Sequence, residues 1–389
     1  MPTMLNIPRE GIPKLSVTPG QMRKAERRLR AGTGRIAVDT ERAGGFRYDD
    51  RAFLLQLRRS GSGTLLIDTE THREIVAPAL AEALTTEWVL HDASTDLPSL
   101  RALGLKPTGI FDTAIAARLL NIMPYRLPEL CAHFLGVTMR NNHGQEDWSR
   151  RPLPQSWLNY AALDVEMLLE LADACEAALA QAGKLDWAAQ EFTHILQIPS
   201  PQPSWETSKP ARTLKRPQEL AIVRGLWQRR DTMAQAMDVA AHRVLPDKAI
   251  VAIAKAQPSS VGQLARLPDF PAELRRHAGQ WLAASQAGLS QRPWPKAHAR
   301  PSTPSQRDWE KKYPDTFAIA REAETLLGAL HQKVNVHEDS IVSRKALRSI
   351  LWAIMHRGVS PEEAQQQLAL RPWQMELITP LLAAVLPAT

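Results

Sequence analysis

An apolar β-strand that ends in two acidic residues is predicted for Ile36-Ala37-Val38-Asp39-Thr40-Glu41. Side chains two residues apart in a strand point to the same face of the sheet. Asp39 and Glu41 should therefore aim both carboxylates at one point. Because carboxylate oxygens are the ligands that Mg²⁺ prefers, this strand predicts part of a metal site.

Two further acids follow along the chain. Asp96 lies in His91-Asp92-Ala93-Ser94-Thr95-Asp96-Leu97, and Asp164 lies in Tyr160-Ala161-Ala162-Leu163-Asp164. Four carboxylates can hold a pair of Mg²⁺ ions about 4 Å apart, the arrangement used for in-line attack on phosphodiesters. Each acid alone would more often be a surface charge, so the hypothesis depends on the set and its order.

That order resembles the DEDD superfamily of 3′→5′ exonucleases, whose motifs are a strand Asp-x-Glu, an Asp before an apolar residue, and Tyr-x-x-x-Asp or His-x-x-x-x-Asp. Position 160 is Tyr and position 159 is Asn, so the chain resembles the tyrosine subclass, DEDDy. The flanks over about residues 30–190 are similar to the ribonuclease D family. They comprise Val38-Asp39-Thr40-Glu41, Leu55-Gln56-Leu57, Leu66-Ile67-Asp68, Leu90-His91-Asp92-Ala93, Phe111-Asp112-Thr113, Leu135-Gly136-Val137, Asp147-Trp148-Ser149-Arg150-Arg151-Pro152-Leu153 and Tyr160-Ala161-Ala162-Leu163-Asp164-Val165.

The resemblance implies an α/β ribonuclease-H-like exonuclease core, a mixed sheet flanked by helices, followed by all-α HRDC-type helical domains. It implies that two divalent cations, Mg²⁺ or Mn²⁺, are bound by the catalytic acids Asp39, Glu41, Asp96 and Asp164. Tyr160 precedes Asp164 by four residues, so both face one side of a helix, and its phenol is expected to orient the attacking water. With an ordinary pKa near 10, a tyrosine is a poor proton acceptor.

Several residues near the motifs are candidate contacts to nucleic acid. Arg150 and Arg151 are candidates to clamp phosphate, and Trp148 to stack on a base; the alternative is a loop anchored by a buried tryptophan. Gln56 on its strand could touch substrate. His91 lies near the expected groove, although a lone histidine at a strand end is more often structural. Relatives often carry a lysine shortly after the Leu-Gly-Val motif, and Arg140 is the expected substitute here.

The local patterns predict strands at 35–39, 53–58, 64–68 and 88–91, and a turn at 42–51. Helical spacing is found at 76–87, 97–103, 113–120, 127–134 and 156–182. Asp112 is expected to cap the helix that starts at Thr113.

A basic segment follows the exonuclease-like part. Residues 209–300 contain 16 Lys and Arg against 6 Asp and Glu, although the whole chain carries only +7. Such an excess favours an attraction for nucleic acid. Three stretches resemble the helicase-and-RNase-D C-terminal (HRDC) module: Leu226-Trp227-Gln228-Arg229-Arg230-Asp231, Arg243-Val244-Leu245-Pro246-Asp247-Lys248 and Pro258-Ser259-Ser260-Val261-Gly262-Gln263-Leu264. Expected RNA-phosphate contacts, with a solvated helix face as the alternative, are Arg224, Arg229, Arg230, Arg243 and Lys248.

Proline-rich stretches predict the domain boundaries. We expect a basic N-terminal extension at 1–30, the exonuclease domain at 31–195, a linker at 196–212 and an HRDC domain at 213–290. A second linker at 291–307 would precede a C-terminal helical domain at 308–389. Val342-Ser343-Arg344-Lys345-Ala346-Leu347 resembles the C-terminal region of the family, where a second, divergent HRDC module can occur.

Composition limits the class of protein. A chain of 389 residues with 44% hydrophobic and 23% charged residues is typical of a soluble protein with two or three domains. No run of 18 apolar residues predicts a membrane span, and residues 1–30 lack the apolar segment of a secretory signal. Cys131 and Cys175 are expected in apolar helices as core residues, so a reducing cytoplasm fits.

The favoured function is a metal-dependent 3′→5′ exoribonuclease that releases nucleoside 5′-monophosphates. The expected partner is RNA with a free 3′ end, tRNA precursors in particular, and we expect a monomer that does not bind membranes. One alternative is a DNA exonuclease of the same superfamily, because no residue can be assigned to the 2′-hydroxyl. The other is a catalytically inactive RNA-binding protein, which would be expected to have lost a ligand, whereas all four acids and Tyr160 are present.

Overall fold

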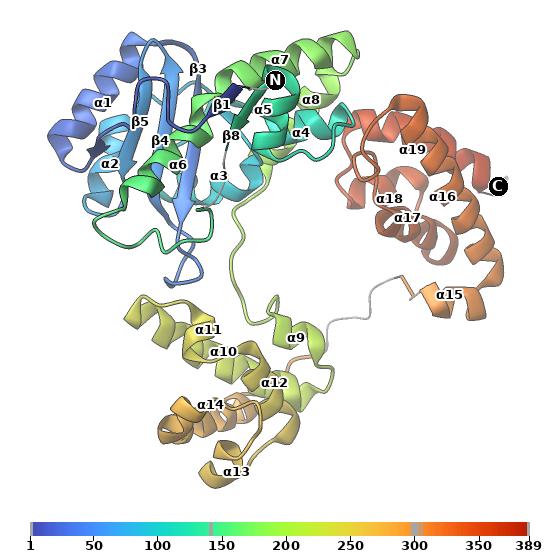
Figure 1. Cartoon of the computed structure of the whole chain (residues 1–389). Coiled ribbons are helices and arrows are strands. Elements are labelled where there is room, and N and C mark those ends of the chain that lie inside the picture. The colour runs from blue at the N-terminus through green and yellow to red at the C-terminus, as the bar shows by residue number, and fades with distance from the viewer. Residues whose placement is uncertain (1–2, 140–142, 297–302, 305, 387–389) are drawn as a thin grey trace. The chain divides into compact units, whose positions relative to one another are not determined.

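The structure is a computed structural model, and it describes residues 3–139, 143–296, 303–304 and 306–386. The chain divides into two compact units. The first contains Met1–Arg42, Ala52–Ser200 and Pro301–Thr389, and the second contains Ala43–Arg51 and Pro201–Arg300. Each unit has its own hydrophobic core. Figure 1 shows the elements of both.

A mixed six-stranded sheet forms the centre of the first unit, as the sequence predicts (Figure 1). Its order is β2-β5-β4-β3-β6-β7, with β4 antiparallel to β3 and β5, and parallel pairing for β2–β5, β3–β6 and β6–β7. Strand β3 thus has hydrogen-bonded neighbours on both sides. The strands are β2 (Leu15–Ser16), β3 (Thr33–Arg42), β4 (Ala52–Ser60), β5 (Gly63–Asp68), β6 (Glu87–Leu90) and β7 (Gly109–Asp112).

Helices cover this sheet, and two of them carry predicted functional residues. Helix α6 packs against β3, β4 and β5, while α7 packs against β3 and β6. A small parallel pair, β1 (Thr3–Leu5) with β8 (Val137–Met139), lies apart from the main sheet. The helices are α1 (Pro19–Ala31), α2 (Arg73–Leu80), α3 (Ala93–Ala102), α4 (Thr113–Leu119), α5 (Leu127–Leu135), α6 (Gln155–Glu166), α7 (Leu168–Gln181) and α8 (Leu185–Gln197).

Some local predictions are confirmed and others are corrected. Asp112 caps α4 as expected, because its carboxylate accepts hydrogen bonds from the backbone N–H groups of Ala114 and Ile115 at 2.8 and 3.0 Å. Cys131 and Cys175 are buried and form no disulfide, also as expected. The single helix expected at 156–182 is wrong, since Met167 is not helical and separates α6 from α7.

Residues 1–30, expected as a basic N-terminal extension, contribute a helix to the first unit. Helix α1 buries Met22, Ala25 and Leu29 in the core of the first unit. Thr18 and Gln21 form a capping box at its start. The Thr-x-x-Gln pattern of this capping box is visible in the sequence and predicts a helix start. The many basic residues at 23–30 favoured an interpretation as a charged extension instead.

The C-terminal helices belong to the same core as the sheet. Trp187 of α8 stacks on Trp373, with ring centroids 4.7 Å apart. The ammonium group of Lys184 donates to the carbonyls of Leu119 and Asn335 at 2.7 Å each. A cut near residue 200 would therefore divide a shared core. These helices are α15 (Gln306–Lys312), α16 (Pro314–Val334), α17 (Arg344–Arg357), α18 (Pro361–Gln367) and α19 (Pro372–Val385).

The second unit is helical, as the HRDC resemblance implies. Its core includes Leu226, Leu245, Ile250 and Trp281. Within the residues described in either unit, no helix is long and apolar enough to cross a membrane. The elements are α9 (Lys209–Thr213), α10 (Pro217–Met237), α11 (Ala241–Val244), α12 (Asp247–Ala256), α13 (Val261–Ala265), the 3₁₀ helix η1 (Ala272–His277) and α14 (Ala278–Ser290).

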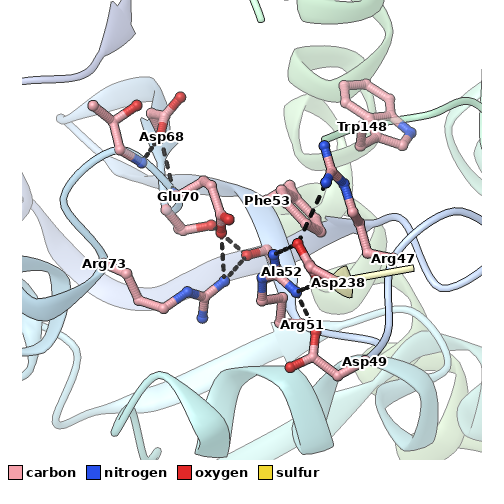
Figure 2. A network of polar contacts seen from close by, with 12 residues as sticks. Arg47, Asp49, Arg51, Ala52, Phe53, Asp68, Glu70, Arg73, Trp148 and Asp238 are labelled. Atoms are coloured by element: carbon pink, nitrogen blue, oxygen red, sulfur yellow. Dashed lines mark hydrogen bonds and ion pairs between the residues drawn. The ribbon is translucent and has the colours of Figure 1, made fainter. Parts of the chain in front are cut away.

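The loop between β3 and β4 is built into this second unit. Arg51 donates to both carboxylate oxygens of Asp238, at 2.9 and 2.8 Å, and also to Asp49 (Figure 2). The hydroxyl of Tyr48 donates to Asp231 at 2.9 Å. The predicted turn is therefore more than a connection, because its side chains contribute to the helical unit. In the first unit, Figure 2 shows the carbonyl of Ala52, the first residue of β4, accepting a hydrogen bond from Arg73.

A tight crossing of α10 and α14 generates a stability prediction. A Cβ at Gly225 would lie 2.2 Å from the carbonyl oxygen of Ala284, which belongs to backbone that cannot easily move. Gly225→Ala should destabilise the second unit by about 1–3 kcal/mol through overpacking. Hydrogen exchange of peptides from α10 and α14 in the full chain should show faster exchange.

Gly262→Ala in α13 is the matched control, because a Cβ there meets nothing within 4 Å. It should be neutral or stabilise by about 0.4–1 kcal/mol. Equal exchange in the two variants would contradict the close-packing argument.

Candidate active site

Strand β3 presents Asp39 and Glu41 on one face, as strand alternation predicts. Gln56 of β4 lies opposite Asp39 in the antiparallel pair. Its side-chain amide donates to Asp39 Oδ2 at 3.4 Å and to Glu41 Oε1 at 3.5 Å. One neutral donor therefore contacts both acids, which confirms that their carboxylates share a face.

Helix α6 brings a third acid to this pair. Ligand oxygens of Asp39, Glu41 and Asp164 all lie within 4.8 Å of one another. One helical turn earlier, the hydroxyl of Tyr160 hydrogen-bonds to Asp164. Three carboxylates so close together form a hard, anionic donor set that fits Mg²⁺ or Mn²⁺.

The fourth acid is held differently. Asp96 of α3 is buried, and its Oδ1 accepts hydrogen bonds from the Thr40 hydroxyl at 2.6 Å and from the Arg42 guanidinium at 2.7 Å. Its Oδ2 accepts from the Thr95 hydroxyl at 3.0 Å. The predicted convergence of four acids is thus observed at close range for three, while the Asp96 carboxylate is occupied by protein donors.

All four acids line one cavity of about 320 Å³, together with Tyr160 and His91. Two arginines that the sequence did not single out, Arg42 and Arg126, line it as well. Arg42 directly follows the Asp-x-Glu motif, and this position is a signal that could have been used. Arg126 stands just before α5 without a motif, so only the fold reveals it.

Burial controls the electrostatics of the acids. Loss of hydration raises the pKa of Asp39 and of Glu41 well above the usual range, and repulsion between the acids adds to this effect. Burial, together with the charge of Asp96, raises the pKa of Asp164 to about 7, although the bond from Tyr160 opposes the increase. The acids of this cavity therefore keep their protons to a higher pH than solvated carboxyl groups do.

Arg42 and Tyr160 interact electrostatically with these acids. Arg42 opposes the increase, because its positive charge lowers the pKa of Asp39, Glu41 and Asp96. Burial, followed by the nearby carboxylates, raises the pKa of Tyr160. The phenol consequently keeps its proton and acts as a hydrogen-bond donor.

The prediction that Trp148, Arg150 and Arg151 contact nucleic acid is wrong for Trp148 and Arg151. Trp148 is fully buried and packs against Trp157, with ring centroids 5.2 Å apart, so its faces are not available to a base. Arg151 donates to Asp68 at 2.5 Å and to the carbonyls of Trp148 and Phe53. The buried-anchor alternative therefore holds.

Arg150 keeps its status as a candidate contact because its side chain is exposed. Gln56 does not, since it is fully buried against the two acids and cannot reach substrate. His91 lines the cavity and hydrogen-bonds through Nδ1 to the hydroxyl of Thr113 at 2.9 Å, and burial lowers its pKa. Its contact with substrate stays a prediction. Arg140 lies outside the described residues.

The second unit has fewer available cations than the sequence suggested. Arg230 is buried and pairs with Asp247 at 2.6 Å, so its assignment to RNA is wrong. Arg224 donates to carbonyls near the end of α14, and Arg243 lies over the ring of Phe46 at 4.6 Å. Arg229, Arg243 and Lys248 are exposed and stay predicted RNA contacts.

Comparison with protein families divides the chain into three matched regions. A 3′-5′ exonuclease model matches residues 16–180. An HRDC domain model matches residues 219–284. A model of a 3′ to 5′ exonuclease C-terminal domain matches residues 302–386.

Individual relatives agree with these matches. Ribonuclease D of Pseudomonas paraeruginosa is 31% identical over 74% of this chain and 75% of its own. A crystal structure of a protein from Bifidobacterium adolescentis is 30% identical, with a TM-score of 0.86 over 99% of both chains. Escherichia coli RNase D, 22% identical, has the same fold with a TM-score of 0.70 over 96% of this chain and 98% of its own.

Other matches are less extensive. The chain covers 25% of a plant RRP6-like protein and 55% and 60% of two further bacterial ribonucleases D, at 29–32% identity.

The raised pKa of Asp164 predicts a pH-dependent stability. A carboxyl whose folded-state pKa lies near 7 binds a proton that the unfolded chain has released, so its contribution to stability is lost as pH rises from about 4 to about 7. Asp164→Asn imitates the neutral form and should escape this loss. In a chelator, the melting temperature of the variant should exceed that of wild type increasingly between pH 5 and pH 8.

Added Mn²⁺ supplies the control, because its ligands must be deprotonated. It should raise the wild-type melting temperature more at pH 8 than at pH 6, and should affect Asp164→Asn much less. Parallel melting curves for both proteins across the pH range would contradict the assignment.

Proposed function

Because this chain belongs to the ribonuclease D family, we propose that it is a metal-dependent 3′→5′ exoribonuclease that releases nucleoside 5′-monophosphates. The observation that carries the proposal is the close approach of Asp39, Glu41 and Asp164 in a cavity that Tyr160 also lines. A binding protein without catalytic activity would have no need for this donor set.

Two divalent cations, Mg²⁺ or Mn²⁺, are proposed as cofactors. Asp39, Glu41 and Asp164 would hold them, with Asp96 as the fourth ligand, and they would supply hydroxide and neutralise the leaving oxygen. The chain holds these ligands on rigid elements. The amide of Gln56 lies 3.4 Å from Asp39 Oδ2 and 3.5 Å from Glu41 Oε1, and the hydroxyl of Tyr160 lowers the pKa of Asp164, so neutral groups beside the acids favour their charged forms.

Tyr160 is proposed to orient the attacking water. Its raised pKa keeps the phenol protonated, so it serves as a donor and not as the base. Its position one turn before Asp164, in the cavity that the four acids line, supports this role.

The proposed substrate is RNA with a free 3′ end, in 3′-end processing such as tRNA maturation. The E. coli structure is described as an exoribonuclease involved in structured RNA processing, which supports a related role here. The exposed Arg229 and Lys248 of the HRDC-matched region are candidate phosphate contacts that act without reading sequence. We propose a monomer with an exonuclease region that extends beyond residues 31–195 to include helix α1, an HRDC region at 213–290, and a C-terminal region at 308–389 that shares the core of the first unit.

An oligonucleotide assay tests this function, with DNA cleavage as the alternative outcome. A 5′-labelled single-stranded RNA should shorten stepwise in Mg²⁺ or Mn²⁺, a 3′-labelled one should release labelled mononucleotide first, and a chelator should stop both. Asp39→Asn should abolish the reaction while thermal unfolding stays cooperative, because it removes one ligand charge and little volume. Preference for the matched DNA would replace RNA as the substrate, and a fully active Asp39→Asn would refute the site.

Tyr160→Phe tests the proposed role of the hydroxyl. The rate with saturating RNA should fall about 10–10⁴-fold, as expected for a group that positions the reacting water, while Mn²⁺ affinity changes little. Tyr313→Phe removes the hydroxyl of a tyrosine that packs edge-on against Trp352 and His356, outside the cavity, and should leave the rate unchanged. An unaltered rate in Tyr160→Phe would return this residue to a packing role.

A further inference from the structure

Arg42 joins the cavity to the fourth acid. It is the last residue of β3, its side chain is 24% exposed, and it lines the cavity. Its guanidinium donates to Asp96 Oδ1 at 2.7 Å and to the Thr95 carbonyl at 2.5 Å. A protein cation therefore contacts a residue that belongs to the proposed metal ligands.

The four acids differ in the charge of the side chains that donate hydrogen bonds to them. Asp39, Glu41 and Asp164 meet neutral donors, namely the amide of Gln56 and the hydroxyl of Tyr160. Asp96, by contrast, meets two hydroxyls and the charged guanidinium. A divalent ion that approaches Asp96 must displace a positive charge, whereas an ion at the three-acid cluster need not.

Geometry explains why Arg42 reaches Asp96. Thr40 lies between Asp39 and Glu41 on β3, and Arg42 follows an irregularity in the pairing with β4 between Glu41 and Arg42, at the end of the strand. Both Thr40 and Arg42 donate to the same oxygen, Asp96 Oδ1. The other arginine in the cavity, Arg126, is 81% exposed, and its recorded ion pair is with Glu129 at 4.0 Å.

We propose that Arg42 is a built-in counter-ion of Asp96 that weakens cation binding there and turns to the RNA phosphate when Asp96 takes up a cation. This inference rests on the proposed function and adds a residue that determines the order of binding. A guanidinium released from a carboxylate is well suited to phosphate, because its fork of donors matches both groups. Arg42 would then be a phosphate contact in the loaded enzyme and a competitor of the cation before loading.

The first measurement is Mn²⁺ binding to the full chain without RNA, by calorimetry. Wild type should bind one ion tightly and a second more weakly. Arg42→Gln should tighten the weaker site by about tenfold, equivalent to one modest ion pair. Arg126→Gln is the matched control, because it removes the same charge from the same cavity without touching Asp96, and it should tighten that site much less.

The second measurement is the affinity for adenosine 5′-monophosphate in saturating Mn²⁺. This product-like probe contains no phosphodiester, so it binds without being cleaved. Arg42→Gln should weaken its binding about tenfold, a change opposite in sign to the effect on Mn²⁺. Arg42→Lys keeps the charge without the fork, so it should keep the weak second site and recover only part of the nucleotide affinity.

The outcomes separate the two proposals. If wild type bound no Mn²⁺, the proposed function would fail. If it bound two ions but Arg42→Gln matched Arg126→Gln, or weakened cation and nucleotide binding together, the counter-ion role would be overturned while the function stood. If Arg42→Gln unfolds, Arg42→Lys becomes the deciding variant. The proposal then requires that Arg42→Lys binds the nucleotide less tightly than wild type while its second Mn²⁺ site stays weak.

Discussion

Negative charge held away from water is the constraint on which this cavity depends. Asp39, Glu41 and Asp164 approach within 4.8 Å, and burial raises the pKa of each, with a further increase from neighbouring carboxylates that include Asp96. Such a cluster persists only on a rigid support. Strand β3 provides it, because β4 and β6 bond to it on either side while α6 packs on β3, β4 and β5. The mixed sheet thus holds together groups that would otherwise separate.

The sequence predicts those parts of the site that follow local periodicity. Alternation along a strand placed Asp39 with Glu41, and spacing along a helix placed Tyr160 with Asp164, because both rules act within a few residues. The contact of Asp96 with Arg42 spans 54 residues and depends on how α3 meets β3. No local pattern contains that information. The core shared by α8 and α19 escaped prediction for the same reason, since a proline-rich segment says nothing about what packs beyond it.

Counts of basic residues overestimated the RNA-binding surface, because the fold uses some arginines for contacts within the protein. Arg151 and Arg230 were expected at phosphates, yet each is used to bind a carboxylate and backbone carbonyls. A guanidinium has five donors in a fixed plane, so one side chain can satisfy several loop acceptors at once. A basic excess in a sequence therefore overstates the surface available to RNA. Exposure, which distinguishes Arg229 and Lys248 from Arg230, appears only in the folded chain.

The four residues Asp39-Thr40-Glu41-Arg42 are best understood as two interleaved pairs. Asp39 and Glu41 form the first pair. Both accept hydrogen bonds from Gln56, and both lie close to Asp164. The even members, Thr40 and Arg42, both hold Asp96. The end of one strand thereby carries two of the proposed cation ligands together with the donors that occupy a third, Asp96. The difference between Asp96, which is paired with a guanidinium, and the other three acids therefore requires only the end of β3 and the helix that supplies Asp96.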